Sequence, residues 1–445
     1  MSLDRKPTDL RTLTTPEALV DTFQQAERPE GSSWVGLEHE RFVYPRASAE
    51  PVPYGGPGGI SALFAALEPA GYQPFRESPE GPTIALTRGG LTVSLEPGGQ
   101  VELSGTPFRT AREVHAEAVL HAAHLRTAAA QLGLVPACIG YRPWGVPAEM
   151  PWMPKERYAA MRQTLASRGR LALDMMLMTC TTQVSLDWTD EADCARKVTL
   201  AARLAPLLVA LYANSPLLRG QPSGWQSYRS RVWNEVDPSR CGYFPALVDG
   251  SFSYRAYCDW ALDAPLLFLR RQGRYLTPRL SFRELLARGW EGAPALASDW
   301  TDHLSTLFPE VRIKAVLEVR SADSGSVATA GALAALWRGL LYDARALEDA
   351  GRLLPRLPFS EHLAFHAEAQ RNGLRGTVRG VPLGELARGM VAVAREGLQR
   401  LDPLDVPLLE PLEEIVRTGR SPADALLAAF ARDPSPASLL AATAL

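Results

Sequence analysis

Four glutamates in two short segments carry the first chemical signal of this sequence. Glu38 and Glu40 alternate within SWVGLEHERFVY, and Glu96 and Glu102 flank a Pro-Gly-Gly turn in LEPGGQVELSG. Acidic side chains are rare among apolar strand residues unless a partner compensates for their charge. Because even spacing along a strand repeats one face, we expect the members of each pair to share a sheet face, as far as the turn inside the second pair allows.

Clustered carboxylates on one sheet face would repel one another and lose hydration, so they would need cations. Ligand sets made of oxygen alone suit Mg²⁺ or Mn²⁺ better than zinc, and magnesium usually leaves positions open for phosphate oxygens. The pattern therefore indicates a magnesium or manganese site that takes part in nucleotide chemistry. An acidic sheet face in contact with solvent explains the same spacing, and the spacing alone does not decide between the two.

Two further segments favour the metal site. Gln183, in TTQVSLD, offers another oxygen ligand, and Glu318 with Arg320, in VLEVRSAD, places a fifth acid beside a guanidinium. An arginine next to a metal suits a phosphoryl group in transfer or a substrate carboxylate. A local salt bridge is the alternative explanation for Arg320.

Other catalytic patterns are absent from the sequence. No G-x-S-x-G elbow occurs, and YGGPGG lacks the G-K-[ST] of a phosphate-binding loop. The five cysteines are scattered and include no C-x-x-C, so neither a disulfide framework nor a zinc site is expected. We expect reduced thiols in or near the core.

The elements that must position these residues mix strands and helices without β-α-β alternation. Tight turns at Gly89-Gly90 and Pro97-Gly98-Gly99 join successive strands. This order favours the α+β class, a curved antiparallel sheet with flanking helices. The predicted strands cover residues 33–44, 83–105, 175–188 and 312–323, and the main predicted helices cover residues 15–25, 60–71, 110–132, 189–213 and 386–401.

The composition excludes some kinds of binding partner and predicts where the protein is located in the cell. The 445 residues are 46% apolar and carry a formal net charge of -2, which argues against a nucleic-acid or anionic-membrane partner. The most apolar stretches are too short or too interrupted to span a bilayer. The N-terminal segment has no apolar core of signal-peptide length. We therefore expect a cytoplasmic protein that binds small molecules.

Several stretches between Trp34 and Gln399 together resemble the plant-type glutamate–cysteine ligase family, which makes γ-glutamylcysteine for glutathione biosynthesis. The matching stretches are GLEHERF, SLEPGGQVELSG, MPKERYAAM, LALDMMLMTCTTQVSLDW, ANSPLLRGQPSGWQSYRSRVW, FPEVRIKAVLEVRSAD and WRGLLYD. The resemblance implies an ATP-dependent ligase with a glutamine synthetase-like catalytic core. It also implies one catalytic domain over residues 1–445, with a helical C-terminal region at about 383–445, in a monomer or homodimer.

The resemblance assigns roles to the residues singled out above. Arg229, in SYRSRVW, would hold the α-carboxylate of glutamate, and Arg320 would contact the phosphate in transfer. MPKERY would form part of the pocket wall. ATP and Mg²⁺, or Mn²⁺, would be the cofactors. The implied metal ligands are Glu38, Glu40, Glu96, Glu102, Gln183 and Glu318.

Two departures from the family pattern leave the amine acceptor open. The arginine strand continues as RSADSGSVAT in place of a Gly-rich loop, and Arg231 occupies a position that is often histidine in the family. Cysteine is the expected acceptor, with glutamate and ATP as the other substrates. A related ligase that uses another amine, and a non-catalytic nucleotide-binding paralogue, are the alternatives.

Overall fold

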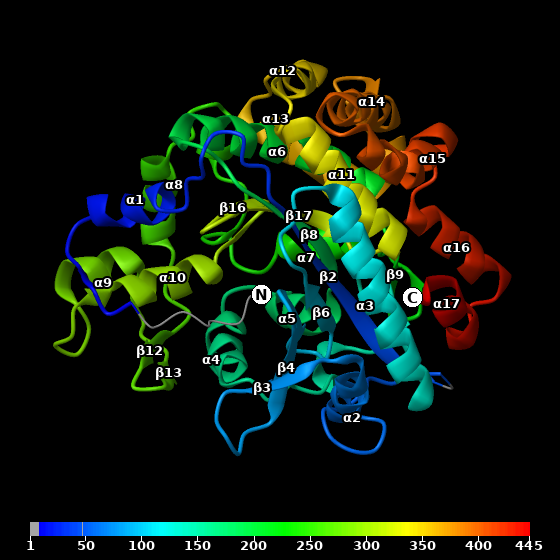
Figure 1. Cartoon of the computed structure of the whole chain (residues 1–445), viewed down its shortest axis with the longest axis horizontal. Coiled ribbons are helices and arrows are strands. Elements are labelled where there is room, and N and C mark those ends of the chain that lie inside the picture. Colours follow the sequence, from blue (N-terminus) through cyan, green and yellow to red (C-terminus); the bar gives the residue numbers. More distant parts are fainter. Residues whose placement is uncertain (1–8, 47) are drawn as a thin grey trace.

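An antiparallel nine-stranded sheet lies at the centre of the chain, shown in Figure 1 as a computed structural model that describes residues 9–46 and 48–445. Strand β2 is central: β8 and β6 pair with its first half, and β7 pairs with its second half. The sheet order is β16 (Val311–Ile313), β17 (Leu317–Asp323), β8 (Thr181–Leu186), β2 (Val35–Pro45), β6 (Val101–Ser104), β5 (Leu91–Leu95), β4 (Thr83–Arg88) and β3 (Gln73–Arg76), with β7 (Leu134–Ala137) beside β2.

Short two-stranded sheets form in the segments that connect the elements around this sheet. All are antiparallel except the pair β11 and β15, which is parallel. The pairs are β1 (Thr12–Leu13) with β14 (Ala295–Leu296), β9 (Leu217–Leu218) with β10 (Gln221–Pro222), β11 (Cys241–Gly242) with β15 (Phe308–Pro309), β12 (Leu269–Arg271) with β13 (Arg274–Leu276), and β18 (Thr377–Val378) with β19 (Val381–Pro382).

Helices make up most of the remaining chain. They are α1 (Glu17–Gln24), α2 (Ile60–Leu67), α3 (Ala111–Gln131), α4 (Glu156–Leu165), α5 (Ala172–Met178), α6 (Glu191–Leu211), α7 (Tyr228–Trp233), α8 (Tyr254–Asp263), α9 (Phe282–Arg288), α10 (Ala297–Ser305), α11 (Val327–Leu341), α12 (Ala344–Leu353), α13 (Phe359–Asn372), α14 (Leu383–Leu401), α15 (Glu410–Thr418), α16 (Pro422–Arg432) and α17 (Pro436–Thr443). The predicted α+β class, with an antiparallel sheet and flanking helices, is confirmed.

Side-chain caps begin the long helices where the sequence predicted them. The Thr110 hydroxyl accepts a hydrogen bond from the backbone N–H of Glu113 at the start of α3, and Asp190 does the same for Asp193 at the start of α6. Each cap satisfies a backbone donor that has no partner within the helix. Local sequence thus sets where these helices begin.

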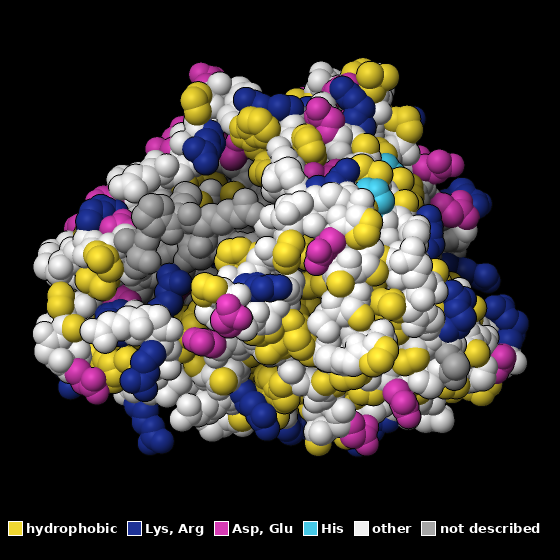
Figure 2. All heavy atoms as spheres, turned by 60° about the horizontal axis from the view of Figure 1, so that its bottom comes forward, with side chains coloured by type: hydrophobic (Ala, Val, Ile, Leu, Met, Phe, Trp, Pro, Cys, Tyr) yellow, Lys and Arg dark blue, Asp and Glu magenta, His cyan; other side chains and the backbone are white. Residues whose placement is uncertain are grey.

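Three helices, α3, α6 and α11, pack on one side of the sheet (Figure 1). Helix α11 is apolar around most of its circumference, and nearly all of its residues are buried between the sheet, α3 and α14. A helix that is apolar on every side needs neighbours all round it. The opposite side of the sheet carries the pocket described below. On the face in Figure 2, Lys and Arg side chains are scattered among acidic and apolar ones.

The methionine run before β8 differs from the prediction. Met175–Met178 was expected to belong to the strand, but these residues form the end of α5, and β8 begins only at Thr181. A short apolar run fits a buried helix as well as a buried strand, so its period does not distinguish them. All five cysteines are buried and free, as expected.

One buried histidine gives a pH-dependent stability. His303 is 2% exposed, and its Nε2 lies 2.8 Å from the carbonyl oxygen of Ala261. Burial lowers the pKa of His303 to about 3. Because the unfolded chain then binds this proton more readily than the folded chain, stability is lost as the pH falls from 6.5 toward 3. We expect His303→Gln to lose less unfolding free energy than the wild type between about pH 7 and about pH 5 in urea titrations.

The partly exposed His124 provides the matched control for this comparison. His124→Gln should keep a pH dependence close to that of the wild type. If the unfolding free energy of the wild type, of His124→Gln and of His303→Gln changes equally with pH, the buried imidazole does not control acid stability.

Candidate active site

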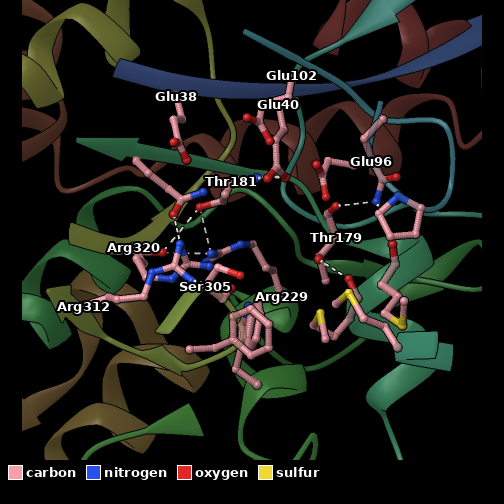
Figure 3. A pocket seen from close by; sticks show the side chains of 18 of the residues that line it. Glu38, Glu40, Glu96, Glu102, Thr179, Thr181, Arg229, Ser305, Arg312 and Arg320 are labelled. Carbon is pink, nitrogen blue, oxygen red and sulfur yellow. Dashed lines mark hydrogen bonds between the residues drawn. The ribbon is translucent and has the colours of Figure 1, made fainter. Parts of the chain in front are cut away.

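The predicted acids line one pocket on the open side of the sheet (Figure 3). Glu38 and Glu40 come from β2, and Glu102 comes from β6. The register places Glu40 directly opposite Glu102, and Glu38 opposite Gln183 of β8. Like charges in directly opposite positions of neighbouring strands destabilise a sheet. The arrangement therefore calls for a positive group in front of these side chains.

Glu96 reaches the same pocket from the turn that follows β5. A Cβ atom on Gly98 would lie 2.5 Å from the carbonyl oxygen of Leu177, and Gly99 has a φ of +86°. Only glycine fits this contact with α5 and this backbone conformation. The Pro-Gly-Gly turn thus packs against α5 and holds Glu96 beside the acids of β2 and β6.

Two of the four carboxylates, Glu40 and Glu96, are poorly compensated by the described residues. Burial, followed by the negative charges of Glu102 and Glu96, raises the pKa of Glu40 well above its usual range. Burial and then Glu102 raise the pKa of Glu96 to about 7. Among residues 9–46 and 48–445, no three acidic, histidine or cysteine side chains form a preformed metal centre. Bound divalent cations fit the charge and the oxygen donors, provided that the carboxylates turn toward them.

Three arginines face the acids from the other side of the pocket (Figure 3). Arg229, near the start of α7, is 3% exposed, and its Nη2 donates hydrogen bonds of 2.8 Å to Thr181 Oγ1 and to the carbonyl oxygen of Arg320. Its Nη1 lies 3.7 Å from Asp323. Its Nε, although buried, has no hydrogen-bond partner in the part of the chain that the structure describes. A buried donor of this kind is costly unless a ligand accepts from it.

Arg320 and the two remaining predicted ligands form one connected group. Arg320 Nη1 donates to Gln183 Oε1 and, at 2.9 Å, to Glu318 Oε2. Gln183 lines the pocket, whereas Glu318 lies behind the arginines and contacts three cationic side chains. The fold therefore brings all eight predicted site residues into one neighbourhood, with Glu318 screened from the other acids.

The MPKERY segment contributes to the wall, as the resemblance implied. Tyr158 lines the pocket, and its hydroxyl donates a 2.6 Å hydrogen bond to the carbonyl oxygen of Leu95, next to Glu96. Lys155 Nζ donates to the same oxygen at 2.6 Å. Beyond them the wall is apolar, with Met161, Met175, Met176, Trp233 and Phe308.

Sequence reasoning missed two residues of this site. Arg312 lines the pocket from β16, and Asp323 supports Arg229 while accepting hydrogen bonds from Ser215 and Ser227. Arg312 had a signal, because RIKAVLEVR, predicted as one strand, carries cations at even spacing. The role of Asp323 depends on contacts with residues about 100 positions away, which no local pattern shows.

An acidic wall that faces an arginine wall over an antiparallel sheet fits an ATP-dependent carboxylate–amine ligase. Glutamate-cysteine ligase family 2 (GCS2) matches residues 34–441, and the chain belongs to that family. The resemblance to plant-type glutamate–cysteine ligases is thereby confirmed.

Curated relatives agree with this assignment. A chloroplastic glutamate–cysteine ligase of Brassica juncea is 37% identical over 398 residues, which cover 88% of this chain and 76% of the relative. Glutamate–cysteine ligase A of Oryza sativa subsp. indica, also chloroplastic, is 34% identical over 417 residues, which cover 93% of this chain and 84% of the relative. A crystal structure of the glutamate–cysteine ligase of Francisella tularensis in complex with AMP has the same fold, with a TM-score of 0.57 and 11% identity over 92% of this chain and 87% of that one.

The predicted cytoplasmic location is wrong. It is contradicted by the curated relatives, which are chloroplastic enzymes. The prediction depended on the lack of an apolar secretory segment, whereas plastid-targeting peptides are polar and rich in serine and arginine, so that test does not detect them. Within the described part of the chain, no helix is both long and apolar enough to cross a membrane.

Proposed function

We propose that this pocket joins the γ-carboxylate of glutamate to the amine of cysteine with ATP as the energy source, through a γ-glutamyl phosphate. The products are γ-glutamylcysteine, ADP and phosphate. The observation that carries the proposal is the pairing of an acidic wall with an arginine wall around one pocket. Membership of the glutamate–cysteine ligase family supports it.

The chemistry explains why both walls are needed. A carboxylate resists attack by an amine because oxide is a poor leaving group, so its oxygen must first take the γ-phosphoryl group of ATP. The γ-phosphate of ATP and the attacking carboxylate are both anionic, so positive charge must offset the repulsion between them. The cysteine amine attacks the acyl carbon, and phosphate leaves. This sequence requires no covalent nucleophile from the protein.

The residues divide into two groups in this proposal. The free Nε of Arg229 would hold the α-carboxylate of glutamate, while Arg320 would contact the transferring phosphoryl group. Mg²⁺, or Mn²⁺, would neutralise phosphate charge during transfer. The residues proposed to hold it are Glu38, Glu40, Glu96 and Glu102, with Gln183 at their edge.

A second cavity suits the nucleoside end of ATP. It continues the same sheet face beyond Glu38, with Gly36 and Ser185 as small side chains on its floor. Gly36 lies two residues from Glu38, or ~7 Å along an extended strand. Trp34, which is 37% exposed and stacks against Arg109, lines its edge. We propose that adenosine lies here and that the phosphates extend toward the arginines.

The acceptor side of the pocket supports cysteine. Arg231, one of the two departures from the family pattern, forms an ion pair with Glu235 and stacks on Trp225, and it does not line the pocket. The apolar wall that includes Met175 and Met176 offers polarisable contacts to a thiol side chain.

An assay of products tests the proposal. Purified protein with ATP, Mg²⁺, glutamate and cysteine is expected to release ADP and γ-glutamylcysteine, both detected by mass spectrometry, and to release neither when glutamate is left out. AMP and pyrophosphate would contradict the acyl-phosphate route. ADP release that does not depend on cysteine but increases with another amine would show that the other amine is the acceptor. Stabilisation by ATP without any turnover would indicate the binding paralogue.

A further inference from the structure

Glu318 is surrounded by cations in the hairpin formed by β16 and β17. Its Oε2 accepts from Arg312 Nη2 at 2.5 Å and from Arg320 Nη1 at 2.9 Å, while Lys314 Nζ lies 2.6 Å from Oε1. The carboxylate is 1% exposed, and both of its oxygens are occupied. A divalent ion at this carboxylate would meet three positive charges at short range, which strongly disfavours it.

The hairpin carries more positive than negative charge. Three cations surround one carboxylate, and Glu38 of β2 is a second acid close enough to act on Arg312 and Lys314, which leaves an excess of one positive charge; both arginines are largely buried. Of the three cations, Arg312 and Arg320 line the pocket, side by side in Figure 3, whereas Lys314 does not. Buried charge of one sign requires a counter-charge. The pocket is where an anionic ligand could supply it.

The two guanidinium groups are held in fixed positions. Arg312 Nη1 donates to the carbonyl oxygens of Ser305 at 3.1 Å and Leu307 at 2.9 Å, and its Nε donates to Glu318 at 2.9 Å. Arg320 is held between Glu318 and Gln183. Donors that are already oriented stabilise developing charge without reorganising during the reaction.

We propose that Arg312 is a second phosphate-binding residue beside Arg320, and that Glu318 positions this arginine pair and does not bind metal. The ligand class is the terminal phosphates of a nucleoside triphosphate and the phosphoryl group in transfer. Lys314 neutralises Glu318, which leaves the charge of both guanidinium groups for the phosphates. This inference rests on the proposed function, and it gives Glu318 a role different from the metal ligation that the resemblance implied.

Metal-free nucleotide binding tests the role of Arg312. ADP is titrated calorimetrically in EDTA, so that only side chains hold its phosphates. Arg312→Gln should weaken ADP binding about 10-fold or more, and Arg312→Lys, which keeps the charge but loses the planar fork, should fall between. The control Arg271→Gln removes an arginine that is paired with Asp299 outside the pocket, and it should bind ADP like the wild type. Wild-type affinity in both Arg312 variants would overturn the proposal.

Magnesium activation tests the role of Glu318. Glu318→Gln should lower kcat, while the Mg²⁺ concentration for half-maximal activity stays within about 3-fold of the wild type, because no ligand is lost. Glu102→Gln provides the comparison, because loss of a proposed ligand should raise that concentration by about 10-fold or more. A comparable rise in Glu318→Gln would make Glu318 a metal ligand and overturn this inference alone. A wild-type protein without ligase activity would overturn the proposed function as well.

Discussion

Glu102→Gln is expected to lower kcat by at least about 10²-fold and to leave the fold intact. Glu102 is 2% exposed and lies opposite Glu40 in the register of β2 and β6. Glutamine has nearly the same shape, so packing is kept while one negative charge of the acidic wall is lost. The proposed cation site then holds its ions less tightly, and repulsion between ATP and the glutamate carboxylate is less well offset.

Stability should change much less than activity in this variant. Burial, followed by the negative charge of Glu102, raises the pKa of Glu40, so the substitution relieves repulsion between the two side chains, while it weakens the hydrogen bond that Ser104 donates to Glu102. We expect the Tm of metal-free Glu102→Gln to stay close to that of the wild type, with an unchanged circular dichroism spectrum. The lost activity could then not be attributed to unfolding.

A matched control distinguishes the loss of a carboxylate in the pocket from the loss of a carboxylate elsewhere in the protein. Glu117, a partly buried acid on α3, accepts hydrogen bonds from Thr106 and does not line the pocket. Glu117→Gln should keep kcat within a few-fold of the wild type. Near wild-type turnover in Glu102→Gln would remove Glu102 from the site.

Arg229→Gln is expected to raise the KM for glutamate by ~10- to 150-fold, with a much smaller change in the KM for ATP. A hydrogen bond to a charged group contributes roughly 1.5–3 kcal/mol, and 1.4 kcal/mol corresponds to a factor of ten. The buried Nε of Arg229 has no hydrogen-bond partner among residues 9–46 and 48–445, so the substrate carboxylate is its proposed acceptor. ATP contacts other side chains in this arrangement, which is why the two KM values should separate.

Two variants make this result specific. Arg229→Lys keeps a positive charge near Asp323, so it should fold like the wild type and lose affinity for glutamate through its geometry alone. Arg231→Gln changes an arginine two residues further along α7 that is paired with Glu235. It should leave both KM values close to those of the wild type. An equal rise of both KM values in Arg229→Gln would show general damage to the pocket and would contradict a specific carboxylate contact.

The sequence by itself determined the faces and the local elements. Alternation at period two is a local property, so Glu38 and Glu40 could be placed on one face of a strand before any partner strand was known. The caps Thr110 and Asp190 likewise act on backbone groups within one turn. Family membership was also visible in the order of short motifs, because those motifs are contiguous.

Only the tertiary structure decided which residues meet. The register opposes Glu40 to Glu102 and surrounds Glu318 with cations, and neither arrangement follows from a pattern within one strand. The methionine run before β8 became a helix because packing against its neighbours, and not its own period, selects its conformation. Long-range pairing sets the electrostatic environment of a side chain, and that environment separates an acid exposed to a cation site from an acid already neutralised by arginine and lysine.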